Sequence, residues 1–278
     1  MVNTVFRGKP LVPKEVPMID ILRDEFGKDS VEEYKGIVRA DYNGNPVLNV
    51  LDYNNKTGNV EGSTPYALVL FNERILKPRG LRTANFPELY FAHSNEVLNL
   101  EGTYEDAALI LRSEEDPNSY LAKDVMSQVK ARNKEQEFPT RINLYDFSLG
   151  KDANAPKGLV FKLNEDAQII HAPVYSGSNK RFSTFDENGD PALDESGDKT
   201  LHTRGSGLLR AYVAGDLDLI ASSEDLANAY PYGRVVVVAK GDAKFFEAYL
   251  SKLKEEKDNL IREIEKRYPE AQRVLRGR

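Results

Sequence analysis

The chain contains 278 residues, of which 40% are hydrophobic and 29% charged, so it can form one large domain or two closely packed halves. Its formal net charge of -6 argues against nucleic-acid binding through a broadly basic surface. Because the chain has no cysteine, disulfides, thiolate nucleophiles and cysteine-ligated zinc or iron–sulfur clusters are excluded.

The N-terminal segment carries no pattern typical of export. Residues 1–26 contain no apolar stretch of the length found in signal peptides. No run in the chain approaches the roughly 18 apolar residues that a membrane-spanning helix requires. By elimination, we expect a soluble cytoplasmic protein without a membrane partner.

The first part of the chain predicts an N-terminal unit followed by strands. Residues 1–40 form this unit, an arm that contains prolines and then a helix over 18–26. Residues 36–53 predict a β-hairpin, because the Asn-Gly-Asn sequence at 43–45 readily adopts positive φ in a tight turn. The apolar run over 65–75 predicts a buried strand.

The next part mixes irregular and regular patterns. Residues 77–89 contain two prolines and predict irregular structure, 90–100 predict an extended segment, and 107–112 predict a short strand. A helix is expected next, with Ser113 or Asp116 as its cap. Its buried face consists of apolar residues at helical spacing, namely Leu121, Val125, Met126 and Val129.

Two distant segments of the chain are similar to each other. Residues 106–120 and 216–230 share Asp, Leu, Ile, Ser, Glu, Asn and Tyr at matching positions. We interpret the match as an internal duplication within a core over 41–240, with halves near 41–135 and 140–240 that meet at a pseudo-twofold seam. A chance similarity is the alternative.

The same match suggests equivalent roles for repeated residues. The Ser-Glu pairs at 113–114 and 223–224 are expected to cap helices, because a serine hydroxyl accepts a free backbone N–H and an acid favours the positive helix end. A short helix is therefore predicted after Ser222 or Ser223. Tyr120 and Tyr230 are expected to anchor these helices in the core.

The sequence pattern of the second half predicts mainly strands. Residues 141–149 alternate like a strand, and 158–175 predict two strands joined by a turn. The continuous β-branched run over 234–239 predicts a central strand that is buried on both faces.

An acidic insertion over 185–200 begins like a calcium-binding loop at 186–190. An EF-hand needs glycine after its third ligand and glutamate at its last position, whereas this chain has Pro191 and Gly197 there. We therefore expect a hairpin turn rich in side-chain-to-backbone hydrogen bonds.

The C-terminal segment over 241–278 predicts a long amphipathic helix to residue 268 and a basic tail. Packing on its own core and pairing with a second copy or another protein are both open. The basic tail offers an alternative contact with nucleic acid or an acidic partner. The seam of this helix consists of Phe246, Leu250, Leu253, Lys257, Leu260 and Ile264.

The candidate sites are few. The three histidines, His93, His171 and His202, show no metal-ligand spacing, so no metal or other cofactor is predicted. The strongest local signal is HTRGSGLLR over 202–210, where glycines and arginines can present backbone N–H groups and guanidinium groups to an anion.

A related Arg-Gly sequence occurs in KPRGLR over 77–82. If the halves face each other, the two segments can converge on a phosphate or carboxylate. The alternative is a glycine turn with solvated arginines. The candidate anion-binding residues are Arg79, Arg82, His202, Arg204 and Arg210.

The sequence thus predicts an α+β protein with a mixed, mainly antiparallel β core, flanking helices, internal duplication and a long C-terminal helix. No hydrolase or P-loop motif is present. We expect a non-enzymatic binding or assembly module. The alternative is an enzyme or sensor that binds a small phosphorylated ligand between the halves.

Overall fold

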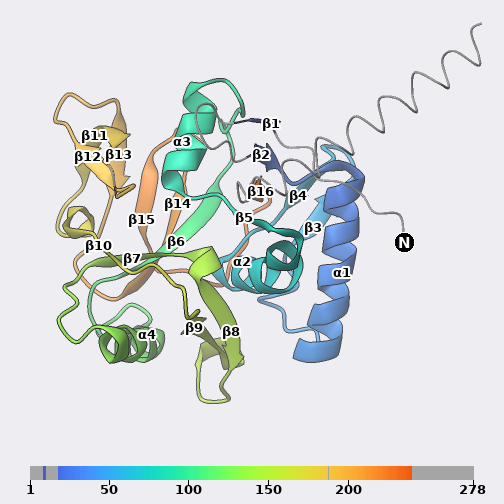
Figure 1. Ribbon diagram of the computed structural model, residues 1–278, viewed down its shortest axis with the longest axis horizontal. Coiled ribbons are helices and arrows are strands. Elements are labelled where there is room, and N and C mark those ends of the chain that lie inside the picture. Colours follow the sequence, from blue (N-terminus) through green and yellow to red (C-terminus); the bar gives the residue numbers. More distant parts are fainter. Residues whose placement is uncertain (1–8, 11–17, 187, 240–278) are drawn as a thin grey trace, which may run out of the picture. The chain divides into compact units, whose positions relative to one another are not determined.

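A computed structural model of the protein describes residues 9–10, 18–186 and 188–239. These residues form helices and two main β-sheets, in which nearly all neighbouring strands run antiparallel (Figure 1). The predicted α+β class with a mainly antiparallel core is therefore confirmed. The predicted helix over 241–268 and the basic tail lie outside the described residues.

The larger sheet has eight strands in the order β10-β7-β6-β14-β15-β13-β11-β12. Only β13 and β15 pair in parallel. The strands are β6 (Glu105–Leu111), β7 (Thr140–Asn143), β10 (Ile170–His171), β11 (Lys180–Phe185), β12 (Pro191–Leu193), β13 (Lys199–His202), β14 (Leu208–Val213) and β15 (Leu219–Ser223).

A second sheet has four strands in the order β1-β2-β16-β5, and the described residues also contain two β-hairpins. The strands of the second sheet are β1 (Lys9–Pro10), β2 (Met18–Ile21), β5 (Leu81–Thr83) and β16 (Val236–Ala239). The hairpins are β3 (Asp52–Asn54) with β4 (Asn59–Glu61), and β8 (Phe147–Lys151) with β9 (Leu159–Leu163).

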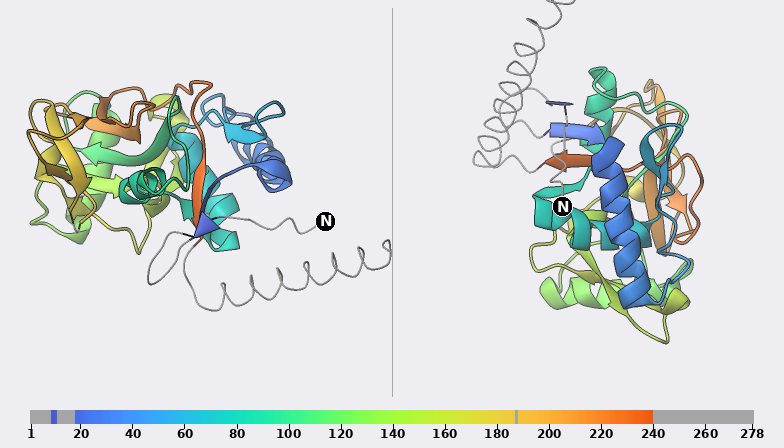
Figure 2. Two further views of the ribbon diagram at one scale, coloured as in Figure 1. Left: turned by 90° about the horizontal axis from the view of Figure 1, so that it is seen from above. Right: turned by 90° about the vertical axis from the view of Figure 1, so that its right-hand side faces the viewer.

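Four α-helices occur among the described residues. Helix α1 packs against the β3–β4 hairpin (Figure 2), and α4 packs mainly against β9. The helices are α1 (Asp24–Tyr42), α2 (Pro65–Phe71), α3 (Phe86–Ser94) and α4 (Ser119–Arg132). None of these helices is both long and apolar enough to cross a membrane.

Several sequence predictions are confirmed. Strand β6 covers most of 107–112, and α4 buries its four predicted apolar residues. Strand β16 lies between β2 and β5 and is buried along its whole length, as expected for a central strand. The predicted turn is present in the β11–β12 hairpin, where Asp186 Oδ1 accepts hydrogen bonds from the backbone N–H groups of Asn188 and Asp190.

The predicted hairpin over 36–53 is wrong, because its first residues belong to α1. Asn43 adopts the left-handed conformation (φ 52°) and its N–H bonds to the carbonyl of Val38. The same Asn-Gly preference for positive φ therefore ends a helix here instead of turning a hairpin. The predicted helix over 18–26 is also misplaced, since β2 occupies its first residues.

The predicted strand over 65–75 is a helix. Pro65 occupies its first turn, and the hydroxyl of Thr64 accepts the backbone N–H of Ala67. Every residue of α2 is buried. A continuous apolar run predicts burial, but its spacing cannot distinguish a fully buried helix from a strand.

The predicted extended segment over 90–100 instead contains most of α3. This helix begins with a capping box, in which Asn85 and Glu88 each bond to the other's backbone N–H. The two cap residues lie inside the segment predicted to be irregular, so the start signal of the helix was missed.

The short helix predicted after Ser222 or Ser223 is absent, and a loop follows β15. The side chain of Asp225 holds this loop by accepting the backbone N–H groups of Ala227 and Asn228. Helix α4 starts after Asn118, which makes no side-chain cap bond, so neither Ser113 nor Asp116 is its cap as predicted. Tyr120 and Tyr230 are exposed, so neither anchors a helix in the core.

Each of the two similar segments contains a strand, β6 in the first and β15 in the second, but only the first leads into a helix. β6 and β15 lie on opposite sides of β14 in one sheet, and both run antiparallel to it. They therefore do not face each other across a seam. A common origin of the two halves stays a prediction.

Candidate anion site

One end of the larger sheet collects the loops that follow β6, β13 and β15. The strand register places Leu111 opposite Leu208, and Ser223 opposite Arg210, so β6 and β15 end where β14 begins. Lys180, the first residue of β11, pairs with Leu201 near the end of β13. Residues far apart in the sequence meet here.

Arg112 directly follows β6 and is only 7% exposed. Its Nε donates to the carbonyl of Tyr175 at 2.7 Å. Its Nη2 donates to Thr203 Oγ1 at 2.6 Å and to the carbonyl of Ala221 at 2.9 Å. Its buried Nη1 has no partner among the described residues.

Arg112 differs from the other buried arginines, because no carboxylate among the described residues contacts it. Leaving a buried charge without a counterion costs several kcal/mol. The other arginines with little exposure all have a carboxylate partner, in the pairs Arg82–Glu88, Arg141–Asp190, Arg210–Asp106 and Arg234–Glu105.

The lack of a carboxylate partner shows in the pKa of Arg112. Burial lowers the pKa of its guanidinium to about 10, the Tyr175 phenol acts in the opposite direction, and the nearby cation of Arg204 lowers the pKa further. Within the described residues, this end of the sheet therefore holds a positive charge without a counterion.

Lys180 adds a second cation. Its Nζ donates to the carbonyls of Val174 and Ser176, each at 2.5 Å. Burial, and then the charge of Arg112, lower the pKa of Lys180. Lys180 and Arg112 thus hold three successive carbonyls of one turn, and neither cation has a carboxylate partner among the residues that the structure describes.

Two polar loops lie next to these cations: residues 176–179 are exposed, and in the loop over 203–207 Arg204 and Gly205 are exposed. The Oδ1 of Asn179 accepts the backbone N–H of Thr203 at 3.2 Å and so joins the loops. The backbone N–H groups of Arg204, Gly205 and Ser206 have no acceptor within the described part of the chain. We call Arg112, Lys180 and these two loops the Arg112 site.

Hydrogen bonds from the neighbouring loops fix the base of the 203–207 loop. The backbone N–H of Arg112 donates to the carbonyl of Gly207 at 2.9 Å, and the N–H of Gly207 donates to Ser113 Oγ at 3.2 Å. The side-chain amide of Asn118 donates to the carbonyls of Leu208 and Glu224. At the tip, Ser206 Oγ donates to the carbonyl of Asp116 at 2.8 Å and Arg204 pairs with Glu224, so hydrogen bonds and an ion pair hold the loop at both its base and its tip.

The structure does not bring together the five residues predicted from the sequence. His202 and Arg204 lie at the Arg112 site, where they contact Asp218 and Glu224 at 3.1 Å each. Arg79 pairs with Glu33 at 2.6 Å, and Arg82, on β5, pairs with Glu88 at 2.5 Å. These two arginines belong to a different part of the fold.

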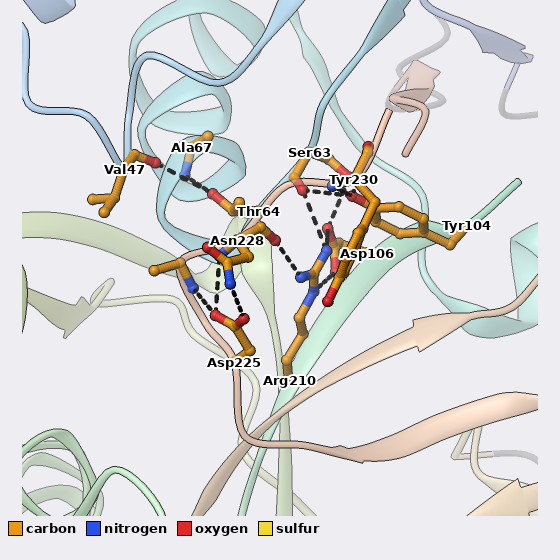
Figure 3. Close-up of polar contacts among 11 residues, drawn as sticks. Val47, Ser63, Thr64, Ala67, Tyr104, Asp106, Arg210, Asp225, Asn228 and Tyr230 are labelled. Carbon is orange, nitrogen blue, oxygen red and sulfur yellow. Dashed lines mark hydrogen bonds and ion pairs between the residues drawn. The ribbon is translucent and has the colours of Figure 1, made fainter. Parts of the chain in front are cut away.

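Arg210 has a structural role (Figure 3). Its Nε and Nη2 bind the carboxylate of Asp106 at 2.5 and 2.8 Å, and Ser63 Oγ donates to the same carboxylate. Its guanidinium also lies 5.0 Å from the ring centre of Tyr104 and donates to the carbonyl of Asn228. All the contacts of the Arg210 guanidinium are made within this network, so Arg210 does not belong to the Arg112 site.

Sequence reasoning missed Arg112 and Lys180. In the sequence, Arg112 only ends an apolar strand, and Lys180 is one lysine in a polar segment. Arg112 is distinguished by its burial without a carboxylate partner among the described residues, and Lys180 by its bonds to the same turn; both features require the tertiary structure.

Comparison with protein-family models finds no match to the chain, and searches of curated proteins and of solved structures likewise find none. Among the described residues, no three His, Asp or Glu side chains gather closely enough to hold a metal ion. The interpretation of the Arg112 site therefore depends on its own geometry.

Proposed function

We propose that the protein is a non-enzymatic binding protein for a small anionic ligand, which it holds at the Arg112 site. The observation that carries this proposal is the buried guanidinium of Arg112, which has an unpaired Nη1 and no carboxylate partner among the described residues. An anion supplies the counterion and offsets the cost of the buried charge.

The surroundings of Arg112 support binding rather than a purely structural role. Its present partners are neutral carbonyl and hydroxyl oxygens, whereas the other arginines with little exposure contact carboxylates. The nearby loop tip offers free backbone N–H groups, which bind anions well when they are held in fixed positions. This proposal joins the predicted binding role with the predicted anionic ligand.

Titration calorimetry and thermal unfolding of the full chain with sulfate test the proposal. We expect sulfate to bind and to raise the melting temperature, since a ligand at about 100 times its Kd stabilises the folded state by about 2.7 kcal/mol. Arg112→Gln and Arg204→Ala should weaken binding, because each removes a cation from the site.

Sulfate also stabilises proteins in general through exclusion from their surface, so binding heats and the comparison of variants decide the result. Arg39→Ala is the matched control, because Arg39 is exposed at the end of α1. If sulfate gives no binding heat, or if Arg112→Gln binds it as tightly as the original chain, the proposal is wrong.

A further inference from the structure

The number of uncompensated charges at the Arg112 site restricts the kind of anion that fits it. Arg204 already has the carboxylate of Glu224 at 3.1 Å. Arg112 and Lys180 have no such partner among the described residues, and the turn carbonyls that they share carry no formal charge. Two positive charges therefore remain side by side.

We infer that the ligand of the Arg112 site carries a dianionic phosphate monoester group, and this inference rests on the proposed anion-binding function. A phosphate monoester carries a charge of about −1.5 to −2 near neutral pH, which matches the two uncompensated cations. A single carboxylate carries one charge and leaves one of the two cations without a counterion.

The remaining hydrogen-bond donors also suit a phosphate. A guanidinium has five N–H donors and an ammonium has three. The Nε of Arg112 makes one bond and its Nη2 makes two, so only Nη1 stays unused, and Lys180 bonds two carbonyls and keeps one donor. The free donor of Lys180 and the loop N–H groups can bond to the terminal oxygens of a phosphate, while the buried guanidinium of Arg112 contributes its charge.

The two cations differ in how a ligand reaches them. Lys180 is only partly buried and lies beside the exposed 176–179 loop, so an anion meets it directly. The Nη1 atom of Arg112 is buried, so the charge of its guanidinium acts on the anion from beneath the surface. Lys180 is therefore the first contact, and Arg112 attracts the phosphate from beneath.

Titration calorimetry of the full chain with glycerol 3-phosphate, sulfate and acetate tests the inference. The second pKa of a phosphate monoester is about 6, so only about a tenth of it is dianionic near pH 5. We expect glycerol 3-phosphate to bind about tenfold more weakly near pH 5 than near pH 8. Sulfate, a dianion at both pH values, should keep its affinity, and acetate should bind more weakly than either.

The outcomes separate the two proposals. If sulfate binds but glycerol 3-phosphate binds equally at both pH values, or if acetate binds as tightly, the dianion inference is wrong and the anion site stands. If sulfate does not bind, the proposed function itself fails. Inorganic phosphate serves as a further probe: weaker binding than glycerol 3-phosphate supports an organic ester as the ligand, and tighter binding contradicts it.

Variants of Lys180 complete the test. Lys180→Met leaves one uncompensated cation, so it should weaken sulfate binding at least tenfold and remove the pH dependence of glycerol 3-phosphate binding. Lys180→Arg should restore both, because it keeps the charge. Lys162→Met is the control, since Lys162 already pairs with Asp124 at 3.1 Å. Unchanged binding in Lys180→Met, with its fold verified by circular dichroism, would overturn the inference.

Discussion

Asp146, in the short turn between β7 and β8, is buried and accepts a hydrogen bond from the side-chain amide of Asn143 at 3.3 Å. Burial raises its pKa to about 6, although hydrogen bonds from Asn143 and from the backbone of Gln168 act in the opposite direction. The ionised carboxylate is therefore less favourable in the folded protein than in the unfolded chain.

The sign of the pH effect follows from this raised pKa. Well below about pH 4 the carboxyl is protonated in both states, and the contribution of Asp146 to stability is then most favourable. As the pH rises through the range from about 4 to 6, the unfolded chain gives up the proton first, so the free energy of unfolding falls.

Asp146→Asn should therefore stabilise the protein near neutral pH. The amide keeps an oxygen that can accept from Asn143, and it carries no charge. We expect the free energy of unfolding to increase by roughly 1 to 2 kcal/mol near pH 7.5 and to change little near pH 4. Urea denaturation at both pH values measures this difference. Asp216→Asn is the control, because Asp216 is exposed. A loss of stability in Asp146→Asn near pH 7.5 would contradict the prediction.

At the scale of elements, the loop between β13 and β14 contains two glycines in very different surroundings. Gly207 has φ +79°, and a Cβ atom there would lie 2.4 Å from the carbonyl oxygen of Pro117 and 2.6 Å from its nitrogen. Gly205 has no other atom within 4 Å of the position of a Cβ atom. Only Gly207 is required for the loop to reach its observed position against the segment before α4.

Gly207→Ala and Gly205→Ala form a matched pair. Gly207→Ala should lower the free energy of unfolding by roughly 1 to 3 kcal/mol, because it strains a left-handed residue and collides with the backbone of Pro117. It should also weaken sulfate binding by moving the 203–207 loop. Gly205→Ala should stay within about 0.5 kcal/mol of the original chain. Equal effects of the two substitutions in urea denaturation would show that the close contact at Gly207 is unimportant.

At the scale of the whole molecule, the two main sheets share one hydrophobic core within the described residues. Ile19 of β2 and Val238 of β16 belong to the same buried cluster as Ile110 of β6 and Leu219 of β15. A buried ion pair between Arg234 and Glu105, at 2.8 Å, also connects the segment before β16 to β6. The two sheets should therefore unfold as one cooperative unit.

Val238→Ala tests this coupling. The substitution removes apolar contacts from a completely buried position, so we expect a loss of about 2 kcal/mol in the free energy of unfolding. Amide hydrogen exchange should then accelerate equally in β16 and in β6. Leu193→Ala is the control, since Leu193 is 55% exposed at the end of β12. Faster exchange in β16 alone would show that the sheets unfold separately.

Local sequence patterns predicted an element correctly where the pattern is typical of only one kind of secondary structure. The helical repeat of Leu121, Val125 and Val129 identified α4, and the β-branched run at 234–239 identified the central strand β16. The run over 65–75 failed, because a fully buried segment has no polar face to reveal its period. The Asn43-Gly44 sequence failed because positive φ serves helix ends and hairpin turns alike.

The sequence by itself determined the α+β class, the burial of the apolar runs and the absence of cysteine chemistry, and it drew attention to the arginines and glycines over 202–210. Only the tertiary structure decided which cations lie near that segment. It removed Arg79, Arg82 and Arg210 by pairing each with a carboxylate, and among the residues it describes it left Arg112 and Lys180 without one. The reason is that charge compensation depends on distances between residues far apart in the chain, which residue type and spacing do not encode.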